Sequence, residues 1–169
     1  MLKPSFDSNR RFWIEVSNGK WTWGDMANGQ SGEDKRSLKA PALPKYIQML
    51  KPLRPGDIVL TYFSSKIAES RELAGSIGGI SQVDSTYRQE GNVLIIDTVE
   101  NTRLSIPIRF SELRAVEESS GHLKFAIRAN FQRYVFEILQ SDVITLFEIH
   151  PENKPIWEKF QDFPDLLTE

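Results

Sequence analysis

Two tryptophans, Trp21 and Trp23, closely follow the dipeptide Ser17-Asn18 in the segment SNGKWTWG (17–24). An indole offers a broad face on which a flat ring can stack, and hydroxyl and amide groups can hydrogen-bond the edge of that ring. The segment therefore raises the question whether these indoles fill the core or form the walls of a pocket that binds a flat ligand.

The tryptophans of residues 11–24 do not all require this explanation. Trp13 follows the alternation of large apolar and polar side chains in RFWIEVS (11–17), so we expect it to face the core. Trp21 and Trp23 would point the same way in an extended segment. They are either walls of a ligand pocket or an apolar plug over the end of a sheet, and the sequence leaves both possibilities open.

Motifs for covalent chemistry or metal binding do not emerge from the sequence. It contains no GxxxxGK[ST], GxSxG or HExxH pattern, no cysteine, and only two histidines, His122 and His150, far apart. Acidic pairs such as Glu33-Asp34 lie in charged runs typical of solvated surface. We therefore predict a binding domain with no catalytic residues, no metal and no cofactor.

Composition indicates one soluble globular domain. The chain has 169 residues, a formal net charge of −2, and 40% hydrophobic and 26% charged residues. We expect a loose N-terminal arm over residues 1–10 and a single domain over 11–169. The sequence has no membrane-length apolar run and no signal-peptide pattern, which predicts a cytoplasmic protein without a membrane partner. Basic residues gather in the first third of the chain, so a local basic face is possible.

The elements that must position these residues alternate along the chain. Apolar and β-branched patterns predict strands at 11–17, 58–65, 74–83, 92–99, 104–110 and 123–129. Helical spacing predicts helices at 43–53, 130–140 and 141–152, with a helical turn at 111–119 and Trp157 docking a last helix. Loops are expected at 18–37 and 84–92, and Gly78 and Gly79 suggest a bulge. The order implies an α+β fold around a curved mixed sheet or small β-barrel flanked by short helices.

Several of these segments resemble the EVE/YTH branch of the PUA-like superfamily, whose members recognise modified bases in nucleic acid. FWIEVSNGKWTWG is similar to the opening of YTH domains, and PGDIVLTYFSS followed by LAGSIGGISQV resembles the EVE pattern. LSIPIRFSEL and VFEILQSDVITLFEI occupy the places of later family elements. The resemblance covers roughly residues 11–150 and implies the PUA-like EVE/YTH fold.

The resemblance also implies a site. Ser17 and Asn18 would contact the edge of a flipped base, and Trp21 or Trp23 would form one wall of an aromatic cage. Tyr62, Ser64 and Ser65 match the end of the central strand. The loop where YTH domains carry a second tryptophan offers only Tyr87 here, which leaves the identity of the base open. Four basic residues flank these loops as candidate phosphate contacts: Lys20, Lys66, Arg71 and Arg88.

The resemblance implies three alternatives for function. The first is recognition of N6-methyladenine or 5-methylcytosine in DNA, as the specificity domain of a modification-dependent restriction system with a fused or associated nuclease or ATPase. The second is an RNA-binding PUA-like or ASCH-like domain, the latter suggested by SKIAESR (65–71). The third is a small-molecule-binding or enzymatic domain that reuses the pocket.

Overall fold

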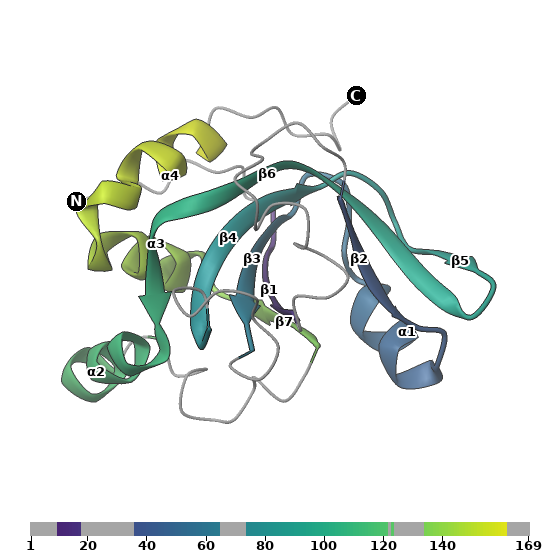
Figure 1. Ribbon diagram of the computed structural model, residues 1–169, viewed down its shortest axis with the longest axis horizontal. Helices are drawn as coiled ribbons and strands as arrows, with labels where there is room; N and C mark the ends of the chain where they lie inside the picture. The colour runs from purple at the N-terminus through teal and green to yellow at the C-terminus, as the bar shows by residue number, and fades with distance from the viewer. Residues whose placement is uncertain (1–9, 18–35, 65–73, 122, 124–133, 162–169) are drawn as a thin grey trace.

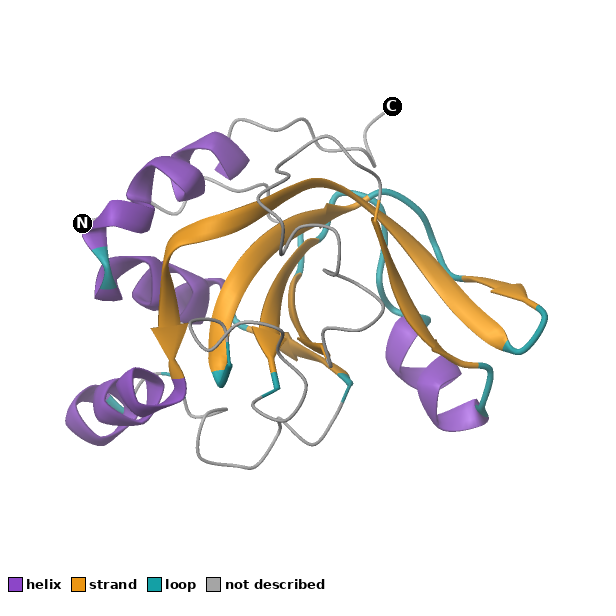
Figure 2. Cartoon of the chain, in the orientation of Figure 1, coloured by secondary structure: helices purple, strands orange, loops and turns teal. Residues whose placement is uncertain are grey.

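A computed structural model describes residues 10–17, 36–64, 74–121, 123 and 134–161. Seven strands and four α-helices are arranged around one curled mixed sheet (Figures 1 and 2). The strands are β1 (Phe12–Ser17), β2 (Arg36–Pro41), β3 (Ile58–Phe63), β4 (Ser76–Val83), β5 (Arg88–Glu90), β6 (Val93–Arg109) and β7 (Val135–Ile138). The helices are α1 (Pro44–Leu50), α2 (Phe110–Ser120), α3 (Gln140–Ile149) and α4 (Lys154–Gln161), with a 3₁₀ turn η4 (Pro151–Asn153) before α4.

The sheet has the order β2-β6-β4-β3-β1-β7, with β5 added beside β6. β1 lies between β3 and β7, two strands that are distant from it in the sequence. It runs parallel to β3 and antiparallel to β7. Successive strands rotate relative to one another, and this rotation with the long bent β6 curls the sheet into a half-barrel (Figure 1). The expected α+β fold around a curved mixed sheet is confirmed.

The two faces of the sheet carry separate apolar cores. On one, which we call the α3-side face, Phe12, Ile14 and Leu60 pack with the buried Trp157 and Phe147. The rings of Trp157 and Phe147 lie 5.2 Å apart, which confirms that Trp157 docks the last helix. On the opposite α1-side face, Trp13 is 4% exposed and packs with Val59, Leu94 and Leu50 of α1, so its expected core position is confirmed.

The amide of Asn153 ties the helical layer to β6. Fully buried, this side chain accepts a hydrogen bond from the backbone N–H of Ile106 at 3.0 Å and donates one to the carbonyl of Ile106 at 2.9 Å. A strand neighbour would offer the same pair of groups, so Asn153 substitutes for a strand at this part of β6.

The structure corrects the predicted helix at 130–140, because residues 135–138 form strand β7. Val135 packs on the α1-side face and Ile138 on the α3-side face, while Glu137 is exposed. In so short a segment the apolar spacing fits a helix as well as a strand, and pairing with β1 decides.

Other boundaries also differ. The strands predicted at 92–99 and 104–110 are one 17-residue strand, β6, whose backbone adopts a positive φ of 55° at Glu100. The loop expected at 84–92 contains β5, β2 begins at the end of the loop expected at 18–37, and the expected helical turn is the 11-residue helix α2. The remaining strand predicted at 123–129 lies almost wholly outside the described residues. The bulge expected at the glycines is confirmed, because the pairing of β4 shifts between Ile77 and Gly79.

Candidate functional site

Three strands meet where β1 and β3 end, and we call this place the strand-end site. Ser17, the last residue of β1, lies opposite Phe63, the last residue of β3, and Phe63 in turn lies opposite Ser76, the first residue of β4. The parallel pairing of β1 and β3 brings the starts of two connections, 18–35 and 65–73, to the same edge of the sheet. Segments that sequence reasoning joined into one pocket therefore leave neighbouring strands.

Only part of the predicted pocket is described at this site. Ser17 and Ser64 lie on neighbouring strand ends, and Ser64 is half-buried. Tyr62 lies half-buried against the α3-side core, where burial raises the pKa of its hydroxyl. Its hydroxyl oxygen is 3.9 Å from the position that a Cβ would take at Gly75, an ordinary contact distance, so the positive φ of 69° and not lack of space favours glycine there. The other residues predicted here lie outside the described residues: Asn18, Lys20, Trp21, Trp23, Ser65, Lys66 and Arg71.

Tyr87 and Arg88 are not brought to the strand-end site. β4 begins beside Phe63 and ends beside Ile58, and Tyr87 follows that far end, half-buried against the α1-side core. Arg88 in β5 forms ion pairs with Asp97 at 2.7 Å and with Glu90 at 3.1 Å, which raise its pKa. Two carboxylates thus already engage its guanidinium in the structure.

Aromatic residues that the sequence analysis did not single out border the strand-end site. The carbonyl of Tyr134 accepts a hydrogen bond from the backbone N–H of Val16 at 2.7 Å, which places Tyr134 beside the end of β1. Its ring meets that of Tyr46 in α1 edge-on, with centroids 6.2 Å apart. The ammonium of Lys45 lies 4.9 Å from the centroid of Tyr46. A cation and two phenols therefore stand near this end of β1.

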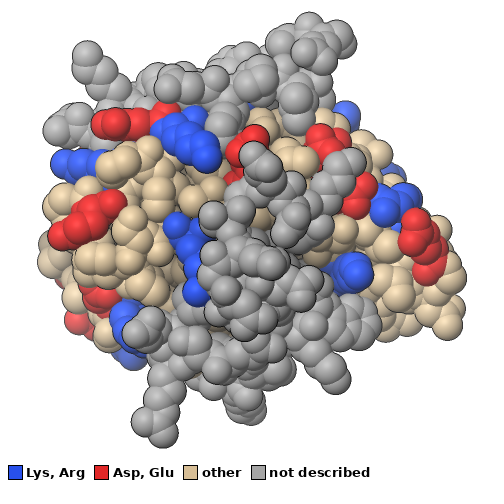
Figure 3. All heavy atoms as spheres, turned by 45° about the horizontal axis from the view of Figure 1, so that its top comes forward, with Lys and Arg blue, Asp and Glu red and all other residues tan. Residues whose placement is uncertain are grey.

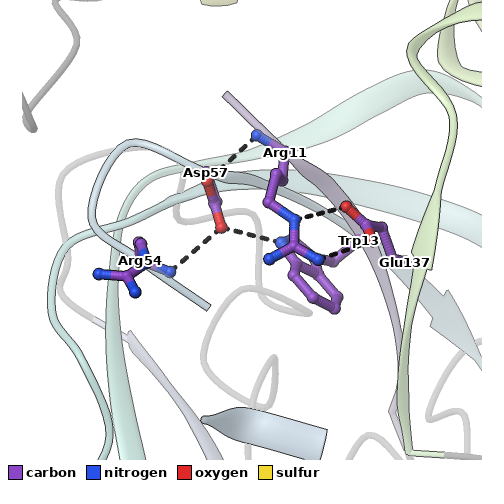
Figure 4. A network of polar contacts seen from close by, with 5 residues as sticks. All are labelled: Arg11, Trp13, Arg54, Asp57 and Glu137. Atoms are coloured by element: carbon purple, nitrogen blue, oxygen red, sulfur yellow. Dashed lines mark hydrogen bonds and ion pairs between the residues drawn. The ribbon is translucent and has the colours of Figure 1, made fainter. Parts of the chain in front are cut away.

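At the opposite end of β1, the carboxylate of Asp57 organises a polar network (Figure 4). It accepts hydrogen bonds from the indole Nε1 of Trp13 at 2.9 Å and from the backbone N–H groups of Arg11 and Arg54, both at 3.1 Å. The guanidinium of Arg11 pairs with both carboxylate oxygens of Glu137 at 2.6 and 2.7 Å and lies 4.8 Å from the ring centroid of Trp13. We call these five residues the Asp57 network.

The Asp57 network has carboxylates with opposite pKa shifts. Asp57 is buried, and desolvation raises its pKa despite the hydrogen bonds that favour its charged form. Glu137 is partly exposed, and the hydrogen bonds from Arg11 lower its pKa. Both carboxylates, the indole of Trp13 and the guanidinium of Arg11 have partners within the protein, so the network fastens β1 to the turn before β3 and to β7.

Between the strand-end site and the Asp57 network, a buried polar row crosses the α1-side face. The strand register places Glu15 opposite Thr61, Thr61 opposite Gly79, and Gly79 opposite Arg103. Directly opposed residues project to the same face, and Leu104, the neighbour of Arg103, packs on the α3-side face. Glu15 and Thr61 are fully buried.

Sequence reasoning missed this row. The one signal of the row in the sequence is Glu15, a charged residue between apolar neighbours in RFWIEVS. A carboxylate is costly to bury and is seldom found inside a protein unless it is paired. Nothing in the local sequence pairs Arg103 with a glycine 24 positions earlier.

Charges of both signs are mixed on the face of the molecule that Figure 3 shows. Lysine and arginine side chains alternate with aspartate and glutamate on the face shown in Figure 3, without a large area of one sign among the described residues. Within the described ranges, no three histidine, cysteine or acidic side chains are grouped to hold a metal ion. No described helix is long and apolar enough to cross a membrane.

Comparison with known proteins gives structural neighbours only. Neither a protein-family model nor a curated protein sequence matches the chain. The structure of human THYN1 in complex with DNA containing 5-methylcytosine aligns with a TM-score of 0.61 at 14% identity, covering 83% of this chain and 98% of THYN1. Protein Atu2648 from Agrobacterium tumefaciens aligns with a TM-score of 0.60 at 14% identity, covering 82% and 92% of the two chains.

A third neighbour is a part of a larger protein. The N-terminal domain of McrB from Staphylothermus marinus aligns with a TM-score of 0.52 at 10% identity, covering 86% of this chain and 98% of that domain. At such identities the likeness concerns the fold. Together with the half-barrel topology, these neighbours show that the chain shares the fold of THYN1, of Atu2648 and of the McrB N-terminal domain.

Proposed function

We propose that this protein is a nucleic-acid-binding module that recognises a modified base, in DNA rather than RNA. The observation that carries the proposal is the alignment with THYN1, which spans most of both chains and whose structure holds 5-methylcytosine DNA. A shared fold alone does not fix a function, so the residues at the strand-end site have to supply the chemistry.

The geometry of the strand-end site supports a pocket for a flipped base. Ser17 ends β1 and Ser64 directly follows the parallel neighbour β3, so the segment carrying Asn18, Trp21 and Trp23 starts beside the segment carrying Ser65 and Lys66. We infer that Trp21 or Trp23 stacks on the base and that Ser17 and Asn18 hydrogen-bond its edge. Extruding the base costs a few kcal/mol, and stacking in the pocket returns about 1–3 kcal/mol.

Phosphate contacts would come from basic residues of the same segments. We assign this role to Lys20, Lys66 and Arg71, which follow Ser17 or Ser64 in the sequence. Arg88 is the weakest of the predicted phosphate contacts, because Asp97 and Glu90 hold its guanidinium at the other end of β4. Since the chain carries a net charge of −2, we expect binding to depend on these local contacts rather than on a global field.

The biological setting we propose is a modification-dependent restriction system, with the nuclease or motor activity on another domain or subunit. The support is the alignment with the N-terminal domain of McrB, in which the same fold is one domain of a larger protein. In this proposal the chain itself binds and does not catalyse.

A binding panel tests the proposal. DNA duplexes and matched RNAs would be identical except for one central base, either unmodified, 5-methylcytosine, 5-hydroxymethylcytosine or N6-methyladenine. We expect tighter binding to one modified duplex, weakening steeply with salt. Trp21→Ala or Trp23→Ala should reduce that preference about tenfold or more, while Leu139→Ala, at an exposed side chain, should not.

The outcomes separate the alternatives. Equal binding to modified and unmodified DNA would contradict the proposal. Preference for RNA would replace it with the RNA-binding alternative. Unfolding of both tryptophan variants would show that the indoles are an apolar plug, and unchanged selectivity in both would remove them from the pocket.

A further inference from the structure

Arg103 differs from the other arginines whose contacts the structure gives. Arg11 and Arg88 pair with carboxylates, and Arg109 donates to the carbonyl of Ala74. The Nε and Nη2 atoms of Arg103 are shielded from water, yet they meet no hydrogen-bond acceptor in the part of the chain that the structure describes. Burying donors in this way costs stability unless an acceptor arrives from outside.

The strand register places Arg103 on the α1-side face of the sheet, the face that Glu15 and Thr61 share. Arg103 lies opposite Gly79 in β4, and Gly79 lies opposite Thr61 in β3. Because the residue between Thr61 and Arg103 is a glycine, no side chain stands between them in the row. The row crosses β1 and β3 at Glu15 and Thr61, two residues before these strands end at Ser17 and Phe63, so it lies next to the strand-end site.

The chemistry of the unpaired atoms defines what they can bind. Nε–H and one Nη2–H lie on the same edge of the planar guanidinium and point in parallel, which suits a ligand with two adjacent acceptors. Cytosine presents such a pair, N3 and O2, on its pairing edge. Adenine has none, because its N1 and N7 each lie beside the N6 amino group, which is a donor.

We propose that Arg103 is the specificity-determining residue of this pocket and that it selects a cytosine-type modified base over N6-methyladenine. The inference rests on the proposed function and narrows it to modified bases of the cytosine type. Arg103 is the donor that recognises the N3–O2 edge once the base has left the duplex, whereas the methyl group is recognised elsewhere in the pocket.

The first test uses the protein and altered DNA. Duplexes would carry 5-methylcytosine, N6-methyladenine, or 5-methyl-3-deazacytosine, which has C–H in place of the N3 acceptor. We expect the 5-methylcytosine duplex to bind about tenfold or more tightly than either of the others. Tightest binding to N6-methyladenine would overturn this inference and leave the proposed function standing. Equal binding to all modified and unmodified duplexes would overturn both.

The second test uses Arg103→Lys, which keeps the positive charge but loses the paired donors. We expect it to lose about tenfold or more in affinity for 5-methylcytosine DNA and to bind the deaza analogue as the parent does. Arg114→Lys on α2, an exposed position, is the matched control and should bind as the parent. If Arg103→Lys keeps full affinity and discrimination, the assignment is wrong; if it fails to fold, the deaza comparison still decides.

Discussion

Two neighbouring regions of the α1-side face differ in whether their buried polar groups have hydrogen-bond partners among the described residues. In the Asp57 network, one carboxylate receives three hydrogen bonds, including one from the indole of Trp13. Two residues further along β1, the polar row leads from Glu15 to Arg103, whose Nε and Nη2 lack an acceptor within the described ranges. The difference indicates that the first region holds the sheet together, whereas in our proposal the unpaired donors of the second bind a ligand.

Removal of the Asp57 carboxylate should have the largest effect on stability. Asp57→Ala leaves the Trp13 indole and two backbone N–H groups without their acceptor in a buried place, which should lower the free energy of unfolding by about 3 kcal/mol. Urea unfolding followed by circular dichroism measures the loss. Asp84→Ala, at the half-buried position after β4, is the control and should cost less than about 0.5 kcal/mol. Equal losses would mean that the network is not a fastening point.

Trp13→Phe should have a smaller effect, because it keeps most of the buried ring and removes one donor to Asp57. We expect a loss of about 1–2 kcal/mol in the free energy of unfolding. In the double variant with Asp57→Ala, the loss in the free energy of unfolding should be smaller than the sum of the two single losses, by at least about 0.5 kcal/mol. Full additivity would show that the indole contributes only by packing.

Titration should separate Asp57 from Glu137. The raised native pKa of Asp57 means that its contribution to stability falls as the pH rises from the ordinary carboxyl value through the raised one. The lowered pKa of Glu137 means that its contribution is present above its ordinary pKa and disappears as the pH falls through the lowered one.

The stability lost in Asp57→Ala should therefore grow as the pH becomes acidic, whereas the loss in Glu137→Gln should shrink. Glu137 is partly exposed, so its loss at neutral pH should stay below about 1 kcal/mol. Urea unfolding over a pH series measures both differences. Losses that change in the same direction would contradict the two assigned shifts.

Arg103→Met should have the smallest effect on stability and thereby sharpen the contrast. Since the guanidinium nitrogens have no described acceptor to lose, the unfolding free energy should change by less than about 0.5 kcal/mol or increase. Binding to the preferred modified DNA should be lost in the same variant. A loss of stability as large as that of Asp57→Ala would place Arg103 among the structural residues.

Elements set by local pattern were predictable from the sequence, and those set by distant pairing were not. α1 begins with Pro44, and β3 is a run of β-branched and aromatic residues, so both are evident without neighbours. β7 is a strand because it pairs with β1, which lies more than 100 residues earlier in the sequence, and the local sequence of β7 does not show this pairing. β2 was hidden because it is short, ends in Pro41 and carries only Leu38 and Ala40 inward.

The candidate site divides in the same way. The sequence shows Ser17 and Ser64 as strand ends, and the structure adds that the two strands are parallel neighbours. Arg103 is an ordinary arginine in a strand until the register sets it opposite Gly79. That its Nε and Nη2 have no acceptor among the described residues can be seen only in the three-dimensional structure, so the sequence could not single it out.

The place of β1 in the sheet has a consequence for how the chain folds. Its neighbours are β3 and β7, so the first strand gains its second partner only after almost the whole chain is available. The bidentate pair between Arg11 and Glu137 joins residues 126 positions apart. The entropy of closing such a long loop is lost before the pairing of the strands stabilises the fold, so we expect slow folding for a domain of this size. The N-terminal strand can complete its pairing only when the C-terminal part of the chain is present. During synthesis, one edge of β1 therefore stays open until β7 has left the ribosome.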